Sequence, residues 1–221
     1  MTNIQWQTCT DPSVMLLELI KRKGRWKWST RKARLFSCAC CRRVWNLLPQ
    51  PAYHGAVELA ERVADKKAKL QELKVFARLP PVDVRGTVPN PVKWAVLAVP
   101  WGQPWWASND ARVLLDYSVP EKKKKQASEA EDQAHCAMIR DIVGLSPMLP
   151  AINPAWLRWN DGAIPRIAQA IYDDRRFADL PILADALEEA GCTNGDILEH
   201  CRGTGPHVRG CWVVDFVLKK T

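Results

Sequence analysis

The sequence lacks any long, uninterrupted hydrophobic run. No stretch approaches the ~20 apolar residues that a membrane-spanning helix needs, and the apolar stretch 14–20 is short and contains Glu18. Residues 1–20 also lack the basic start of a secretory signal. We therefore expect a cytoplasmic protein without a membrane partner, and we expect its eight cysteines to be reduced thiols rather than disulfides.

Signatures of catalysis are missing as well. The chain contains no phosphate-binding glycine loop, and the Cys-x-x-Cys pair Cys38 and Cys41 has no second copy. The adjacent Asp173 and Asp174 would point about 100° apart on a helix, so they would not form a catalytic dyad. We therefore expect a protein with no catalytic residues and no cofactor.

Acidic residues are absent from Lys21 to Arg43. Residues 1–43 contain ten Lys or Arg and two acids, so this segment accounts for the whole net charge of +8. Trp26 and Trp28 alternate with the cations, a composition suited to phosphate contact and base stacking. One hypothesis is therefore weak, sequence-tolerant binding of nucleic acid through residues 21–43. The alternative is a basic loop whose tryptophans pack on the core.

The cations and tryptophans predicted to contact nucleic acid all lie in this segment. They are Lys21, Arg22, Lys23, Arg25, Trp26, Lys27, Trp28, Arg31, Lys32, Arg42 and Arg43. A helical wheel places the last four cations on one side of the helix, opposite its apolar face, and we expect that side to face water.

Helix signals recur through most of the chain, which has an ordinary 47% of hydrophobic residues. Apolar residues at helical spacing predict helices over 12–20, from Ser29 or Thr30 to about Leu48, and over 53–76. Later helices are predicted from their capping residues and glycine stops. The predicted starts are Ser118 (a capping box with Glu121), Asn153, Asp161, Asp179 and Thr193, and the predicted stops are Gly144, Gly191 and Gly203.

Residues 79–106 differ from the rest because prolines interrupt them repeatedly. We expect no helix of useful length there, but Trp94, Trp101, Trp105 and Trp106 are too apolar for a free linker. Three regions follow: a basic helical region 1–78, a Pro/Trp-rich connecting segment 79–117 packed on the helices, and a helical region 118–221. The predicted fold is mainly α, an irregular helical assembly; residues 206–219 fit a helix slightly better than a strand, and both remain open.

Three cysteines fall within "LFSCACCRRVW", residues 35–45. On a helical wheel Cys38, Cys40 and Cys41 belong to a broad apolar face that also contains Phe36. A buried cysteine behaves as a small hydrophobic residue. Structural zinc needs four ligands, and a redox pair would have one thiol at a helix N-terminus. We therefore predict that these cysteines are core residues.

A second group of metal-ligating residue types lies near the C-terminus. His200, Cys201, His207 and Cys211 could bind a metal, although their spacing matches no common zinc pattern. Cys201 and His207 flank a Gly-Thr-Gly-Pro turn and could converge. The alternative is a glycine-rich helix connection whose Cys211 faces the core. We expect a metal-free fold, with these four residues as the metal ligands if one is bound.

Several segments resemble a family of uncharacterised bacterial proteins best known from planctomycete genomes. They are "CTDPSVML", "RKARLFSCACCRRVWNLL", "AVELAERVAD" and the long C-terminal string "AQAIYDDRRFADLPILADALEEAGCTNGDILEHCRGTGPHVRGCWVVDFVL". The stretch "LPILADALEEAG" is also similar to part of the repeat-companion domain. The resemblance implies no catalytic residues. In this chain, residues 79–106 and the turn "GLSPMLP" at 144–150 depart from the family pattern.

Together these patterns favour a non-catalytic helical module for protein interaction or regulation, with another protein as its partner. Nucleic-acid binding through residues 21–43 is the alternative. A Cys/His metal-binding protein is the third hypothesis.

Overall fold

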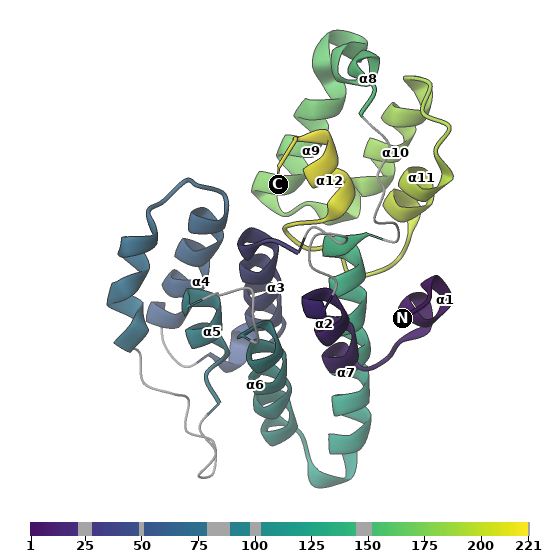
Figure 1. The fold of residues 1–221 in the computed structure, drawn as a ribbon. Helices are drawn as coiled ribbons and strands as arrows, with labels where there is room; N and C mark the ends of the chain where they lie inside the picture. The colour runs from purple at the N-terminus through teal and green to yellow at the C-terminus, as the bar shows by residue number, and fades with distance from the viewer. Residues whose placement is uncertain (22–27, 49–50, 79–88, 98–102, 145–151, 221) are drawn as a thin grey trace. The chain divides into compact units, whose positions relative to one another are not determined.

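The computed structural model describes residues 1–21, 28–48, 51–78, 89–97, 103–144 and 152–220. Within these ranges every regular element is a helix (Figure 1). The prediction of a mainly α fold is therefore confirmed. Residues 22–27 of the basic segment and much of the Pro/Trp-rich segment lie outside the described residues.

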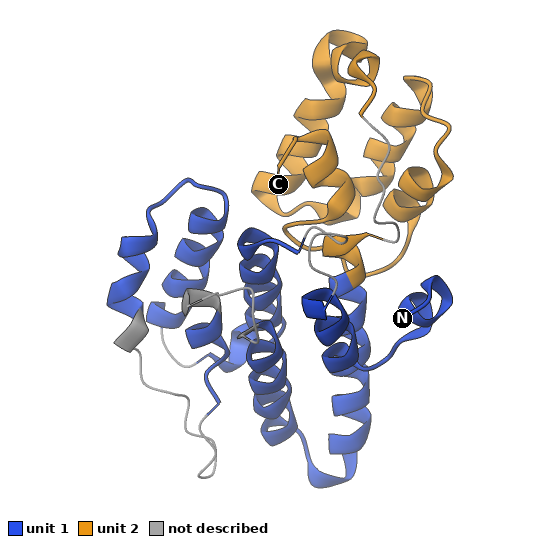
Figure 2. Ribbon diagram, viewed as in Figure 1, with its two compact units in different colours: residues 1–139 blue, residues 140–221 orange. Residues whose placement is uncertain are grey.

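The chain forms two compact units, residues 1–139 and residues 140–221 (Figure 2). The boundary lies within one helix, α7 (Glu121–Val143). The boundary between the two compact units therefore differs from both boundaries predicted from composition, which are near residues 78 and 117.

The described residues of the first unit form six further α-helices and two 3-10 helices. They are α1 (Asn3–Thr8), α2 (Pro12–Lys21), α3 (Thr30–Arg43), η1 (Trp45–Leu47), α4 (Pro51–Ala64), η2 (Leu70–Arg78), α5 (Pro91–Leu97) and α6 (Gln103–Ser118). Helix α3 packs against α4, α5 and α6. Because it has neighbours on several sides, every residue from Arg31 to Cys41 is buried.

Helix α3 corrects one prediction and confirms another. Ser29 caps it, since its side chain accepts the N–H of Lys32 at 3.2 Å. Two of the four cations predicted to face water do not do so, because Arg31 and Lys32 are each 9% exposed, whereas the side chains of Arg42 and Arg43 are 25% and 35% exposed. A helical wheel assigns one buried face to a helix, whereas the neighbours of α3 bury both of its faces from Arg31 to Cys41.

Two other predictions for the first unit are wrong. The helix expected over 53–76 is two elements, α4 and η2, and Lys66 between them has a φ of 58°. The Pro/Trp-rich segment contains α5 and the start of α6. Both proline-bearing helices place the proline in their first turn, where its missing N–H costs no hydrogen bond.

The second unit contains the end of α7 and the remaining helices. They are α8 (Pro154–Arg158), η3 (Trp159–Gly162), α9 (Ala163–Asp174), η4 (Phe177–Asp179), α10 (Leu180–Glu189), α11 (Gly195–Arg202) and α12 (Trp212–Val217). Ile164, Ala168 and Ile171 form the buried stripe of α9, and Leu183 and Leu187 lie on that of α10. Residues 212–217 are helical, which decides between the two structures left open for that segment.

Some of the helix ends predicted from the sequence are confirmed and others are wrong. Gly144 and Gly191 each have a φ of 87°, the left-handed conformation that glycine adopts without strain. Asn153 accepts the N–H of Ala155 at 2.9 Å, as a cap should. Other predicted caps are wrong: Asn194 rather than Thr193 caps α11, and Ser118 donates to the carbonyl of Leu115 as part of α6.

Candidate metal centre

Four side chains of the second unit form a cluster of metal-ligating atoms. They are Asp141, His200, His207 and Cys211, and one ligand atom from each lies within 4.8 Å of all the others. The Asp141 side chain is 3% exposed, His200 13% and His207 9%, and Cys211 is fully buried. The cluster is therefore nearly closed to water.

Different elements position the four side chains. Asp141 lies in the last turn of α7 and His200 in the last turn of α11. His207 belongs to the connection between α11 and α12, and Cys211 is the N-cap residue of α12. Ile197 and Cys201 fix α11 against the core, which orients His200 toward the end of α7.

The distances resemble the edges of a coordination tetrahedron. Asp141 Oδ1 lies 2.6 Å from His207 Nδ1 and 3.1 Å from His200 Nε2, and His200 Nε2 lies 3.3 Å from Cys211 Sγ. Four ligands around Zn²⁺ at about 2.0–2.3 Å would be roughly 3.2–3.7 Å apart. The two contacts of Asp141 Oδ1 are shorter than these edges and would lengthen around an ion, the His200–Cys211 contact matches them, and every other pair lies within 4.8 Å.

The histidines face more acceptors than a neutral ring can satisfy. His207 Nδ1 faces Asp141, and its Nε2 lies 3.4 Å from the carbonyl oxygen of Gly203. A neutral imidazole has one N–H, so one of these contacts needs an added proton or a metal ion. His200 Nε2 faces both Asp141 and the sulfur of Cys211. A single cation among the four groups would satisfy every one of these contacts.

Burial and the neighbouring charges act in opposite directions on the pKa values of Asp141 and His207. Burial alone would raise the pKa of Asp141, but hydrogen bonds from His200 and His207 outweigh it and lower that pKa. Burial would lower the pKa of His207, and the hydrogen bond to Asp141 raises it instead. Burial and the nearby Asp141 raise the pKa of the Cys211 thiol well above its ordinary value. A metal would therefore displace the proton of Cys211 on binding.

Second contacts hold two of the ligands in place. The other carboxylate oxygen of Asp141, Oδ2, accepts the N–H of Val208 at 2.8 Å. The Nε2 of His207 points to the carbonyl of Gly203. Outer contacts of this kind fix the orientation and tautomer of metal ligands.

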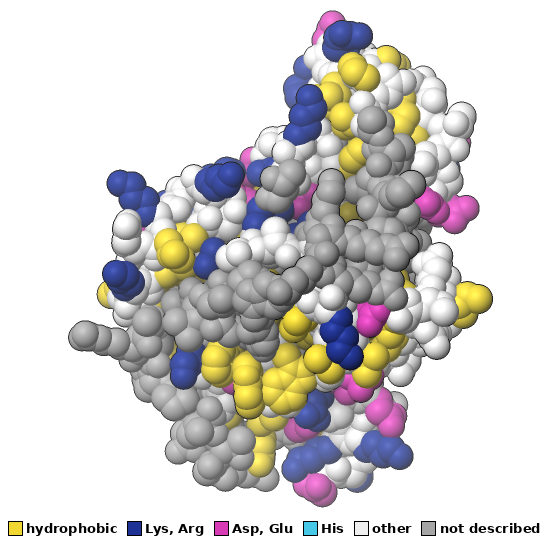
Figure 3. All heavy atoms as spheres, in the orientation of Figure 1, with side chains coloured by type: hydrophobic (Ala, Val, Ile, Leu, Met, Phe, Trp, Pro, Cys, Tyr) yellow, Lys and Arg dark blue, Asp and Glu magenta, His cyan; other side chains and the backbone are white. Residues whose placement is uncertain are grey.

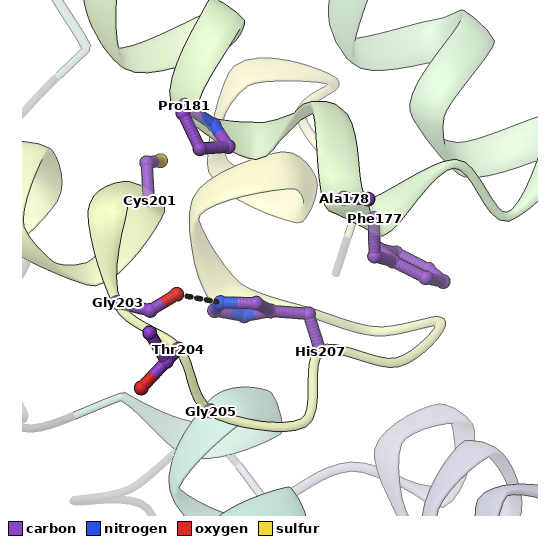
Figure 4. A pocket seen from close by; sticks show the side chains of 8 residues that line it. All are labelled: Phe177, Ala178, Pro181, Cys201, Gly203, Thr204, Gly205 and His207. Atoms are coloured by element: carbon purple, nitrogen blue, oxygen red, sulfur yellow. Dashed lines mark hydrogen bonds between the residues drawn. The ribbon is translucent and has the colours of Figure 1, made fainter.

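The structure brings together three of the four predicted metal ligands. Cys201 is not in the cluster; it is buried, and burial raises the pKa of its thiol to about 12. Cys201 and His207 do converge, but as two residues lining a cavity (Figure 4). Asp141 takes the fourth position. No local signal could have identified it, because it is 59 residues from His200 in a helix with several other acids.

The cysteines of α3 are core residues, as predicted. Cys38 is 1% exposed, and Cys40 and Cys41 are fully buried. Burial raises the pKa of all three thiols well above the ordinary value. They are neither at a helix N-terminus nor in the group of candidate metal ligands.

The described cations of the basic segment are largely engaged within the fold. Arg42 donates two hydrogen bonds to Glu61, at 2.7 and 2.9 Å. Arg43 does the same with Glu131, at 2.8 and 2.7 Å. Arg31 pairs with Asp65 at 3.1 Å. Lys21 is exposed, and Trp28 packs edge-on against Phe36. Arg22, Lys23, Arg25, Trp26 and Lys27 lie outside the described residues.

A third polar group lies in the first unit. Ser108 Oγ is 2.8 Å from His135 Nδ1, and His135 Nε2 is 3.1 Å from Glu131 Oε1. The residue types match a Ser-His-Glu triad. His135 is fully buried and Ser108 is 5% exposed, so this serine does not face a substrate. Together with Arg43 the group forms a structural network between α3, α6 and α7.

Comparisons with protein-family models, curated proteins and solved structures give no match. The four-residue cluster therefore has to be interpreted from its own chemistry. Among the described residues, no helix is both long and apolar enough to cross a membrane.

Proposed function

We propose that the chain is a zinc-binding helical protein whose metal site is formed by Asp141, His200, His207 and Cys211. The observation that carries the proposal is the convergence of one oxygen, two nitrogen and one sulfur ligand within 4.8 Å. Zn²⁺ accepts this mixture because it is borderline soft and has no geometric preference of its own. Hard cations such as Mg²⁺ and Ca²⁺ prefer oxygen ligands.

The bound zinc would have a structural role. Four protein ligands complete a tetrahedral shell, whereas catalytic zinc keeps one position for water or substrate. The cluster is also nearly inaccessible, with Asp141 at 3% exposure. A zinc ion would join the end of α7 to the end of α11 and the start of α12, a segment otherwise connected through the irregular residues 203–210.

Cobalt substitution tests the proposal. Titration of the purified full chain with Co²⁺ should give about one ion per chain and a thiolate-to-metal absorption band, because Cys211 would be a ligand. Cys211→Ser should remove that band. It should also weaken Zn²⁺ binding by more than the roughly 10–100-fold typical of losing an outer contact.

Cys201→Ser is the matched control, because Cys201 is an equally buried cysteine outside the cluster. It should leave the Co²⁺ spectrum and the Zn²⁺ affinity unchanged. If Cys201→Ser and Cys211→Ser behave alike, or if the unmodified chain binds no Co²⁺, the metal site is refuted.

Contact with another protein is a second candidate function. It is favoured by large apolar side chains at the surface of the first unit: Val14 and Leu17 of α2 are 45% and 52% exposed, and Trp106 of α6 is 45% exposed. Figure 3 shows hydrophobic side chains gathered on the face of this unit where α6 lies. An exposed apolar surface of this kind could bind another protein without any catalytic residue.

Three further expectations accompany these proposals. The cytoplasmic location is supported by the eight free cysteines. Membership of the bacterial family rests on the segments given above. Nucleic-acid binding by residues 21–43 loses support from the pairing of Arg31, Arg42 and Arg43 with acids, and would depend mainly on Lys21 and on residues 22–27.

A further inference from the structure

Arg34, in the first half of α3, is a buried cation without a counter-charge. It is 6% exposed, and among the described residues none forms an ion pair or a hydrogen bond with its guanidinium group. Of its three nitrogen atoms only Nε is fully buried without a partner, so the two terminal nitrogens retain contact with solvent. Buried charges in proteins are normally paired and hydrogen-bonded, and this one therefore requires an explanation.

The other arginines of α3 show what Arg34 lacks. Each of them contacts a carboxylate: Arg31 pairs with Asp65, Arg42 with Glu61 and Arg43 with Glu131, at nitrogen–oxygen distances of 3.1, 2.7 and 2.7 Å. Arg34 is also more buried than Arg42 or Arg43, so its need for a counter-charge is greater than theirs. The fold thus supplies an acid to every arginine of this helix except the one at position 34.

The surroundings of Arg34 do not compensate its charge. Burial lowers the pKa of its guanidinium group, and the nearby Cys38 acts in the opposite direction. Cys38 is itself buried, and burial raises the pKa of its thiol well above the ordinary value, so at neutral pH it supplies no negative charge. A buried charge without a partner is strongly destabilising, whereas an apolar side chain of similar volume is not. An arginine at this position therefore lowers the stability of the fold unless an anion accompanies it.

The chemistry of the guanidinium group indicates which anion would bind. Its planar fork of N–H donors matches the two oxygen atoms of a carboxylate. Arg34 supplies one positive charge, and the charge of Arg31, one turn earlier, is already balanced by Asp65. A monovalent anion would therefore leave the site neutral, whereas a dianion such as sulfate would leave a buried negative charge. The small exposed fraction of Arg34 also requires a small ligand.

We infer that Arg34 forms a binding site for a small monovalent carboxylate such as acetate, which accepts hydrogen bonds from Nε–H and one terminal N–H of the guanidinium group. The bound carboxylate replaces the acid that the chain does not provide, and it makes the stability of the first unit depend on the concentration of a small organic acid. The site lies in the first unit and the four candidate metal ligands lie in the second, so the inference does not rest on the proposed zinc site.

The test compares urea unfolding of the full chain in sodium acetate with unfolding in an equal concentration of sodium chloride, at neutral pH. Acetate should raise the unfolding midpoint, because it binds the folded state alone. At about 100 mM acetate and a Kd of about 10 mM, which is within reach of a ligand with so few atoms, the equilibrium constant of unfolding should fall about tenfold. Arg34→Met should lose this effect, and in chloride it should be at least as stable as the unmodified chain.

Two further variants and a direct measurement make the result specific to Arg34. Lys21→Met is the matched control, because it removes one exposed cation from the same unit; it should respond to acetate as the unmodified chain does. Arg34→Lys keeps the charge but loses the planar fork, and it should bind acetate several-fold more weakly. Saturation-transfer NMR on the acetate methyl signal measures binding without unfolding, and this signal should be lost in Arg34→Met.

Three outcomes would overturn the inference. If acetate stabilises Arg34→Met as much as the unmodified chain, its effect is a general salt effect and Arg34 binds no anion. If the unmodified chain is equally stable in acetate and chloride, water rather than an anion satisfies the guanidinium group. If sulfate gives a larger Arg34-dependent shift than acetate, the ligand is not a monovalent carboxylate. Should Arg34→Met fail to fold, equal acetate NMR signals from Arg34→Lys and the unmodified chain would also refute the site.

Discussion

Asp141 and His207 are 66 residues apart in the sequence, yet the carboxylate Oδ1 of one lies 2.6 Å from Nδ1 of the other. The contact joins the last turn of α7 to the connection between α11 and α12. Both side chains are more than nine-tenths buried. Such a pair either shares a proton or holds a cation, and the nearby His200 and Cys211 favour the cation.

Zinc should stabilise the protein measurably. A ligand that binds only the folded state at 100 times its Kd adds about 2.7 kcal/mol to the free energy of unfolding. Urea unfolding with excess Zn²⁺ should therefore shift to a higher midpoint than unfolding with a chelator. Asp141→Asn should abolish this difference, since the amide is a poorer ligand than the carboxylate. A midpoint independent of zinc in the unmodified chain would contradict a structural role.

Gly144 tests the packing beside the metal cluster. Its φ of 87° is unfavourable for other residues, and a Cβ placed there would lie 3.3 Å from Cγ of Trp212. Trp212 follows Cys211 in the chain, and its ring centroid is 5.1 Å from that of His200. Gly144→Ala should lower the free energy of unfolding by about 1–2 kcal/mol for the backbone alone and should also weaken zinc binding.

Gly191→Ala provides the control for that variant. Gly191 has the same φ of 87°, but a Cβ there would have nothing within 4 Å. Gly191→Ala should lower the free energy of unfolding through the backbone alone and should leave the zinc affinity unchanged. If the two variants are equally stable and bind zinc equally well, Trp212 does not support the site.

The sequence predicted the helices of the second unit better than those of the first. Its helices carry a single apolar stripe, such as Ile164, Ala168 and Ile171 of α9, which a periodicity argument detects. Helix α3 is buried from Arg31 to Cys41, and periodicity cannot show that neighbours cover a polar side. Within that stretch Arg31 pairs with Asp65, which is 34 residues away in the sequence.

The candidate metal site, like the fold, was predictable from the sequence only in part. His200, His207 and Cys211 lie within one short segment, so their residue types alone made them candidates. Asp141 and the exclusion of Cys201 depend on how α7 and α11 are placed in the second unit, which no spacing rule contains. A helix end that approaches from a distant part of the chain can be found only in the folded structure.

Acid should destabilise the first unit through Glu131. Burial would raise the pKa of this carboxyl, but contacts with His135 and Arg43 lower it from 4.5 to about 2. A depressed pKa stabilises the folded state above pH 4.5, and this stabilisation is lost as the pH falls from 4.5 toward 2. The shift corresponds to about 3 kcal/mol. Urea unfolding between pH 7 and pH 2 measures it.

Glu131→Gln should be less stable at pH 7 and should lose less stability on acidification than the unmodified chain. Glu129→Gln is the control on the same helix, because the Glu129 side chain is 61% exposed. It should reproduce the pH dependence of the unmodified chain. Equal acid sensitivity in Glu131→Gln would show that the network with Arg43 does not hold this carboxylate ionised.

Cys40 should behave as a core residue in solution. Cys40→Ser should lower the free energy of unfolding by ~1–3 kcal/mol, because a hydroxyl would replace an apolar contact. Its thiol should also resist alkylation in the native protein, since it is fully buried. Cys9 is only partly buried and should react first. Rapid native labelling of Cys40, identified by mass spectrometry, would contradict the position of α3.

The paired arginines of α3 should contribute to stability rather than to nucleic-acid binding. Arg43→Gln leaves the buried Glu131 with a weaker partner, and Arg42→Gln does the same for Glu61; the side chains of these acids are 3% and 2% exposed. Each variant should lower the free energy of unfolding by about 1–3 kcal/mol. Each should leave the salt dependence of any oligonucleotide binding unchanged, because a cation already paired with an acid releases no phosphate counterion.

Lys21→Gln is the contrast: Lys21 is exposed at the end of α2, and its loss should reduce the salt slope by about 0.7 if a single strand binds there. Titration of a labelled single-stranded oligonucleotide at several salt concentrations distinguishes these cases. A reduced slope in Arg42→Gln or Arg43→Gln would mean that these arginines leave their acids to contact phosphate.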